Sequence, residues 1–295
     1  MTLARISSVT YQTRDIATTV AAIKEYFAYR VVAQGEVDEP FAEAWRAPAL
    51  FGAACVIMQP VSGTNFYLRF IEASASADYA PLMTFGWNAA ELLVDDVYAL
   101  ADRLASSPFQ ILGGPRDLLG NGTAVALQVR GPGDEVFYLT QISGKRMQAT
   151  YGAAVCPVDR LFIAVLGVQD HAVSRSFYRE LGAGITRPRR FPIRVISNAH
   201  GLDPDSSRYL IGGACLDEQY RIEIDAYPNS AIARPIKPGG FPPGLGLVSI
   251  DTPSLDVFAA DFDVVQGDDS APYFGARFVR IVGPDNEWLE LIERS

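Results

Sequence analysis

The chain has 295 residues, of which 49% are hydrophobic and 20% are charged, a composition typical of globular proteins. This length is sufficient for two domains of average size with separate cores. The 34 acidic residues exceed the 25 basic ones, and the net charge of -9, without any basic run, argues against nucleic acid or a membrane as a partner. The three cysteines form no CxxC pair, and no signal peptide or long apolar run is present, which predicts a cytoplasmic protein without disulfide bonds.

The first quarter of the chain predicts one strand, one helix and three further strands. The first strand covers 8–13, the helix covers 16–29, and the three strand candidates cover 30–37, 53–59 and 66–73. The segment from Phe66 to Glu72 has the alternation expected of a half-buried strand. The same order restarts with a strand at 89–94 and a helix at 97–106, which Asp95 and Asp96 can cap.

The second unit continues with strands near 109–112, 123–130 and 136–142, after which the apolar periodicity disappears. The third unit runs from Leu161 through a helix at 172–181 to a strand at 220–225. The fourth has a strand at 245–251, a helix at 255–262, and strands near 263–266, 277–282 and 287–293. The four similar units predict an internal duplication. We expect an N-terminal domain at 1–148 and a C-terminal domain at 149–295, each built from two units.

Two short motifs carry a resemblance to a known family. Residues 176–182 (SFYRELG) look like a helix ending in FYxxxLG, and residues 283–290 (GPDNEWLE) look like a DPDGNxxE hairpin. In this order and spacing the chain resembles the vicinal oxygen chelate superfamily, which includes glyoxalase I, extradiol dioxygenases and bleomycin-binding proteins. The resemblance implies an α+β fold of four βαβββ modules, paired into two glyoxalase-like domains whose curled mixed sheets surround clefts.

The resemblance also implies positions for metal ligands on the first and last strands of each module. The last-strand glutamate of the family falls on Arg69, Tyr138, Glu223 and Glu290 in the four modules. The first-strand ligand falls near Val9, Ala89, Phe162 or Ile163, and Gly246. The only histidines, His171 and His200, lie outside these positions, and a guanidinium at Arg69 would oppose a cation. We therefore expect no metal and no other cofactor.

The remaining polar residues supply candidates for catalysis and for ligand contact. Glu290 and Glu223 are candidate bases, because two carboxylates facing one apolar cleft would raise one pKa into the working range. The alternative is that Glu290 pairs with a nearby arginine, such as Arg277 or Arg280. His200 is a candidate from a loop over the cleft. Six residues predicted to lie on strands or next to them are candidates for substrate binding: Arg69, Tyr138, Glu91, Trp288, Arg280 and Tyr273.

Three functions remain open at this point. The first is a metal-independent isomerase or lyase that transfers a proton on a small hydrophobic or aromatic carbonyl compound. The second is a protein that sequesters a drug or metabolite, as bleomycin-resistance relatives do. The third is a dioxygenase or glyoxalase with an unconventional metal site built from Glu223, Glu290, Asp225 or His200. The expected partner is a small-molecule ligand, and whether the chain forms a homodimer stays open.

Overall fold

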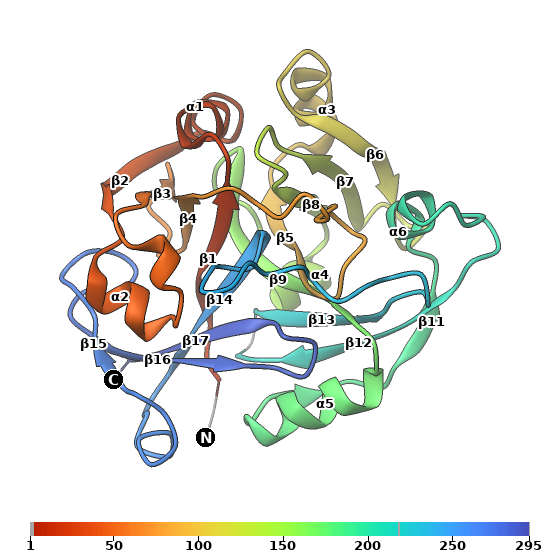
Figure 1. Cartoon of the computed structure of the whole chain (residues 1–295). Coiled ribbons are helices and arrows are strands. Elements are labelled where there is room, and N and C mark those ends of the chain that lie inside the picture. The colour runs from red at the N-terminus through yellow and green to blue at the C-terminus, as the bar shows by residue number, and fades with distance from the viewer. Residues whose placement is uncertain (1–2, 218, 295) are drawn as a thin grey trace.

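The computed structural model describes residues 3–217 and 219–294 and contains four modules in chain order (Figure 1). The elements of the first module are β1 (Ile6–Thr13), α1 (Ile16–Phe27), β2 (Tyr29–Glu36), α2 (Glu39–Ala44), the 3-10 turn η1 (Pro48–Leu50), β3 (Ala54–Pro60) and β4 (Tyr67–Glu72). Those of the second are β5 (Gly86–Val94), α3 (Val97–Leu104), β6 (Gln110–Asp117), β7 (Ala124–Arg130) and β8 (Val136–Ile142).

A short exposed helix, α4 (Lys145–Tyr151), leads into the second half of the chain. The third module has β9 (Val158–Val168), α5 (His171–Glu180), β10 (Gly184–Ile185), β11 (Arg189–Phe191), α6 (Arg194–Ala199), β12 (Tyr209–Cys215) and β13 (Arg221–Ala226). The fourth has β14 (Gly244–Thr252), β15 (Val265–Gln266), β16 (Arg277–Val282) and β17 (Trp288–Glu293). The predicted boundary between residues 148 and 149 falls inside α4.

The three long helices begin at the same type of residue. Asp15, Asp96 and Asp170 each accept hydrogen bonds from backbone N–H groups of the following turn, so that the first exposed donors of the helix are satisfied. The predicted cap at Asp96 is thereby confirmed. The prediction of a helix at 255–262 is wrong. The Phe258 N–H bonds to the carbonyl of Leu255, only three residues earlier, and the segment forms successive turns. The next backbone bond also spans only three residues, because the Asp261 N–H bonds to the Phe258 carbonyl.

The strands form two curled sheets within the described residues. One has the order β15-β16-β17-β14-β1-β4-β3-β2, and the main path of the other is β10-β12-β13-β9-β5-β8-β7-β6. The first sheet therefore joins modules 1 and 4 through the antiparallel pair β1–β14, and the second joins modules 2 and 3 through β5–β9. The prediction that each half of the chain encloses its own cleft is wrong. Every module offers a similar first strand as an edge, so the repeat alone does not determine which edges meet.

The two halves are also joined by a common core and by hairpins that contact helices. One continuous hydrophobic cluster contains residues from all four modules, for example Leu68, Leu127, Ile222 and Leu289. Across residues 3–217 and 219–294, the two halves therefore share their largest core, contrary to the separate cores expected from chain length. Within each half, a hairpin glutamate contacts the helix of the preceding module: Thr19 donates to Glu135, and Tyr178 donates to Glu287. The first contact joins module 1 to module 2, and the second joins module 3 to module 4, in both cases outside the sheets.

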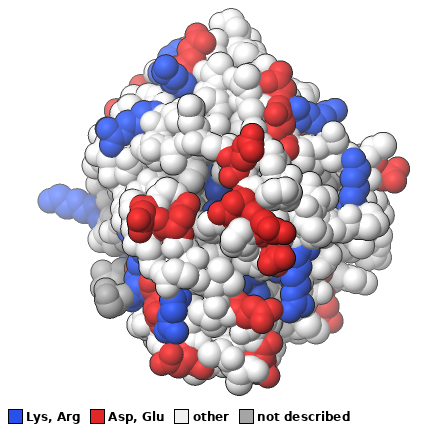
Figure 2. All heavy atoms as spheres, turned by 60° about the vertical axis from the view of Figure 1, so that its left-hand side comes forward, with Lys and Arg blue, Asp and Glu red and all other residues white. Residues whose placement is uncertain are grey.

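The acidic excess of the sequence is visible on the surface. On the side that carries β2 and β15, acidic side chains gather near the middle of the face (Figure 2). No helix among residues 3–217 and 219–294 is long and apolar enough to cross a membrane.

Candidate active site

Two glutamates from different modules face the same cleft in the sheet of modules 2 and 3. Glu91 lies on β5 and Glu223 lies on β13, with β9 between these strands. Glu91 pairs with Ile163 of β9, and Glu223 pairs with Val165 of the same strand. Because alternate residues of a strand share a face, this register brings both carboxyl groups to the concave side of the sheet. Glu91 is 6% exposed, whereas Glu223 keeps part of its surface open to the cleft.

The cleft is a cavity of about 580 Å³ with a mostly apolar lining. Both glutamates lie in its wall, beside Tyr138 and Thr140 of β8. Strand β6 forms one side, and α6, which contacts β6, forms another. Tyr151 at the end of α4 also lines the space. A cavity of this volume and composition is typical of a site for a small organic ligand.

Burial changes the acidity of the carboxyl groups in and behind this cleft. Burial, together with the charge of Glu223, raises the pKa of Glu91 to about 8, although the hydrogen bond of 2.5 Å from Thr140 opposes the rise. Burial raises the pKa of Glu223 to about 7, against the opposing charge of Arg189. Burial and these two glutamates also raise the pKa of Asp225. Near neutral pH one carboxyl of the cleft can therefore hold a proton while the other is ionised.

Unpartnered polar groups lie beside the carboxyl pair. Among the described residues, the hydroxyl groups of Tyr138 and Tyr227 and both carboxyl oxygens of Asp225 are buried without a hydrogen-bond partner. Burial raises the pKa of Tyr138 well above its ordinary value, and Asp225, Glu223 and Glu91 raise it further, so the phenol stays neutral. Buried polar groups are normally paired, and unpaired ones indicate a place for water or for a polar group of a ligand.

The raised pKa values predict that the protein loses stability as the pH rises. In the unfolded chain a glutamate ionises near pH 4.5, whereas Glu223 and Glu91 hold their protons to about pH 7 and about pH 8 in the folded protein. Because the folded state binds more protons between these limits, the free energy of unfolding should fall across them. Urea unfolding at about pH 5 and about pH 8.5 should show a smaller fall for Glu91→Gln than for wild type. The exposed control Glu43→Gln should match wild type, and an equal fall in all three proteins would contradict this prediction.

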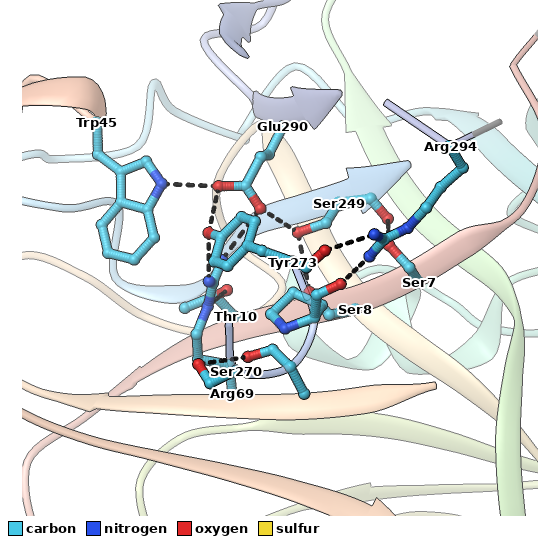
Figure 3. Close-up of polar contacts among 12 residues, drawn as sticks. Ser7, Ser8, Thr10, Trp45, Arg69, Ser249, Ser270, Tyr273, Glu290 and Arg294 are labelled. Atoms are coloured by element: carbon cyan, nitrogen blue, oxygen red, sulfur yellow. Dashed lines mark hydrogen bonds and ion pairs between the residues drawn. The ribbon is translucent and has the colours of Figure 1, made fainter. Parts of the chain in front are cut away.

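In the sheet of modules 1 and 4, an ion pair between Arg69 and Glu290 fills the cleft. The Glu290 carboxylate of β17 is 0% exposed and accepts hydrogen bonds from Trp45 Nε1 (2.8 Å), Tyr273 Oη (2.7 Å), Ser249 Oγ (2.7 Å) and Arg69 Nη2 (3.3 Å). Figure 3 shows Trp45 and Ser249 on opposite sides of this carboxylate. Arg69 Nη1 also donates to Tyr273 Oη at 2.6 Å. Glu290 has no surface open to a ligand.

Aromatic side chains close the space around this ion pair. Trp45, just after α2, packs with Phe241, whose ring lies 5.4 Å from that of Trp288. A methyl group on Gly246, the first-strand ligand position of module 4, would clash with the Phe241 ring and the Pro242 carbonyl oxygen. The glycine is therefore the residue type that this closed packing permits.

The structure thus separates residues that the sequence analysis placed together. Of the predicted site residues, Glu91, Tyr138 and Glu223 line the open cleft, while Glu290, Arg69, Tyr273, Trp288 and Arg280 belong to the other sheet or its filling. The expectation that Glu290 and Glu223 face one cleft is wrong, because β17 and β13 lie in different sheets. The alternative that Glu290 pairs with an arginine is confirmed, but the arginine is Arg69. Arg277 bonds to Glu293, and the Arg280 guanidinium lies 4.4 Å from the Trp288 ring centroid.

His200 and Val9 also differ from their predicted positions. The two ring nitrogens of His200 contact Ser230 Oγ (2.8 Å) and the Leu82 carbonyl oxygen (3.1 Å), and its side chain does not line the cavity. On β1, Thr10 points towards the ion pair, because its Oγ1 accepts from Arg69 Nε, whereas Val9 packs into the main core. In module 2 it is Glu91, two residues beyond Ala89, that carries the polar group of the first strand.

Thr140 and Arg189 are two of the polar residues of the open cleft that lie outside the predicted set of site residues. Thr140 follows Tyr138 by two positions on β8, so the strand alternation already placed both on one face. Arg189 belongs to β11, whose short length leaves no periodic signal. Alternation on a strand is therefore an unused signal for Thr140. Arg189 belongs to the basic cluster at 187–190, for which the sequence leaves open both a solvated turn and a clamp for a carboxylate or phosphate.

Comparison with known proteins identifies the fold. No family model matches the sequence, and no curated protein matches it. Glyoxalase I from Zea mays has a similar structure, with a TM-score of 0.60 and 17% identity over 98% of this chain and 92% of that chain. A putative dioxygenase from Bacillus subtilis has a TM-score of 0.63 and 10% identity over 99% of this chain and 86% of that chain. The chain has the vicinal oxygen chelate fold.

The side chains at the ligand positions of the vicinal oxygen chelate fold do not suit a metal in either sheet. In the sheet of modules 1 and 4, the carboxylate at a ligand position is that of Glu290, and it accepts a hydrogen bond from the Arg69 guanidinium. In the other sheet, Tyr138 and Ile163 stand where further donors would be needed beside Glu223 and Glu91. Among residues 3–217 and 219–294, no three His, Cys, Asp or Glu side chains converge as metal ligands. Two carboxylates without an imidazole or a thiolate fall short of the ligand sets that proteins use for zinc.

Proposed function

We propose that the cleft of modules 2 and 3 catalyses proton transfer at a carbon next to a carbonyl group, as an isomerase or lyase. The observation that carries this proposal is the carboxyl pair, in which Glu223 ionises near pH 7 while Glu91 retains its proton to about pH 8. A base and an acid with these pKa values in one cavity are matched to neutral pH. The mostly apolar lining favours a small hydrophobic or aromatic carbonyl compound.

The side chains of the cleft have complementary roles in this reaction. The ionised Glu223 carboxylate takes a proton from the carbon, and the electron pair of that C–H bond moves into an enolate. The protonated Glu91 carboxyl and the neutral Tyr138 hydroxyl donate hydrogen bonds to the negative oxygen. In an isomerisation, Glu223 returns the proton to a different carbon and is ionised again. In an elimination, the leaving group departs with the electron pair of its bond, and Glu223 releases its proton to solvent. Thr140 holds the Glu91 carboxyl through its hydrogen bond.

The experiment measures hydrogen–deuterium exchange at the α-carbon of aryl ketones and aromatic 2-oxo acids in D₂O by proton NMR. Wild type should exchange at least one of these compounds faster than buffer alone, and Glu223→Gln should not. Glu43→Gln, an exposed change on α2, should retain the wild-type rate. Binding of these compounds by wild type without exchange would contradict proton transfer and would favour sequestration, the second function considered from the sequence.

A further inference from the structure

The carboxyl cleft continues into a second hollow of about 330 Å³. The two spaces share part of their lining, including Glu223, Tyr151 and Arg189. Glu223 therefore lies at the junction between them. A ligand that reaches the carboxyl pair can extend into the second hollow without leaving the protein.

Arginines predominate among the charged residues that line the second hollow. Three arginines line it: Arg187, Arg189 and Arg221. The Arg189 guanidinium lies 5.1 Å from the centroid of the Phe191 ring. The Arg221 guanidinium donates to the Asp217 carbonyl at 3.2 Å and the Tyr220 carbonyl at 2.9 Å. Within the described residues, neither Arg187 nor Arg189 forms an ion pair with a carboxylate of the protein.

The backbone around the arginines leaves room for a ligand. Gly212 and Gly213 of β12 line the same hollow, and they place no side chain in it. Gly213 N–H donates to Thr186 Oγ1 at 2.7 Å, which ties the segment before Arg187 to β12. The arginines therefore stand on a chain segment that is attached to the sheet.

We propose that Arg187 and Arg189, called the arginine annex below, bind the anionic group of a ligand whose apolar body occupies the carboxyl cleft. The anionic group is a carboxylate, sulfonate or phosphate, since the guanidinium fork matches the oxygens of all three. This inference rests on the proposed function for the identity of the cleft as the ligand site. It narrows the substrate class to amphiphilic organic anions with the carbonyl group near Glu223.

A matched pair of fluorescent probes tests the annex without requiring turnover. 8-Anilinonaphthalene-1-sulfonate and N-phenyl-1-naphthylamine share one aromatic body, and only the first carries a sulfonate. Titrations at about pH 6 keep both cleft glutamates protonated, so that repulsion from them does not mask the effect. Wild type should bind the sulfonate about fivefold to tenfold more tightly than the neutral probe, as expected for two partly exposed charge contacts.

The variants assign this preference to the annex. Arg187→Gln/Arg189→Gln should abolish the preference, measured as the ratio of the affinities for the two probes, since any effect of Arg189 on the aromatic body is common to both. Arg190→Gln is the control, because Arg190 is exposed on the same strand but lines neither hollow. A preference that persists in the double variant, or no binding of either probe by wild type, would overturn the proposal. Because no proton exchange is measured, loss of catalysis in the exchange experiment would leave this result unaffected, and the two failures are distinguishable.

Discussion

Arg69→Met should lower the free energy of unfolding by about 3–5 kcal/mol, because it leaves the Glu290 carboxylate buried without its countercharge. Both side chains are almost fully buried, at 2% and 0% exposed, so solvent cannot replace the lost partner. Burial alone would lower the pKa of the Arg69 guanidinium, but Tyr273 and Glu290 outweigh this effect and raise it, so the group stays charged. Urea unfolding measured at neutral pH gives the difference directly.

An exposed ion pair provides the control for this experiment. Arg277 bonds to Glu293 at 2.7 Å, but the Arg277 side chain is 43% exposed. Arg277→Met should therefore have a much smaller effect than Arg69→Met. In a double-mutant cycle, Arg69→Met and Glu290→Gln should be strongly non-additive. Equal effects of Arg69→Met and Arg277→Met would mean that the cleft of modules 1 and 4 is open to solvent.

Glu223→Gln should reduce the rate of proton exchange by about 10²- to 10⁴-fold, the range expected for removal of a general base. In wild type the rate should rise as Glu223 ionises near pH 7 and fall as Glu91 ionises near pH 8, which gives a narrow bell-shaped profile. The alkaline limb arises because an ionised Glu91 no longer donates a hydrogen bond to the enolate. The rate is measured by proton NMR in D₂O buffers across this range.

The variant Glu91→Gln separates the two limbs of the profile. Its amide donates a hydrogen bond at every pH, so the alkaline limb should disappear while the acid limb remains. Thr140→Val, which removes the hydrogen bond that lowers the pKa of Glu91, should move the alkaline limb upwards. A profile that stays bell-shaped in Glu91→Gln would assign the acid to another residue.

The fold could be predicted from local signals, but the pairing of the modules could not. Helix starts at Asp15, Asp96 and Asp170 follow from local capping chemistry, and the strands follow from alternation. By contrast, whether β1 pairs with β5 or with β14 depends on contacts between edges that resemble one another. Helix α2, which brings Trp45 over Glu290, lies in a segment where the sequence predicts no element.

The candidate site shows the same division between local and long-range information. Glu223 and Glu290 occupy equivalent positions in their modules, and the sequence treats them alike. Their environments differ because Glu290 meets Arg69 from a module 221 residues away, whereas Glu223 meets Glu91 across β9. Glu290 therefore forms an ion pair with Arg69, whereas Glu223 lies near a second carboxyl group, that of Glu91. Only the arrangement of the sheets distinguishes them.

Titration of the side-chain carboxyl carbons tests this account most directly. Carbon-13 NMR of protein labelled at glutamate Cδ, with signals assigned from Glu91→Gln and Glu223→Gln, reports each ionisation. We expect two coupled titrations near pH 7 and pH 8 in wild type, and a single titration in either variant. Titration of both glutamates near their ordinary pKa of 4.5 would contradict a carboxyl pair that shares a proton in this cleft.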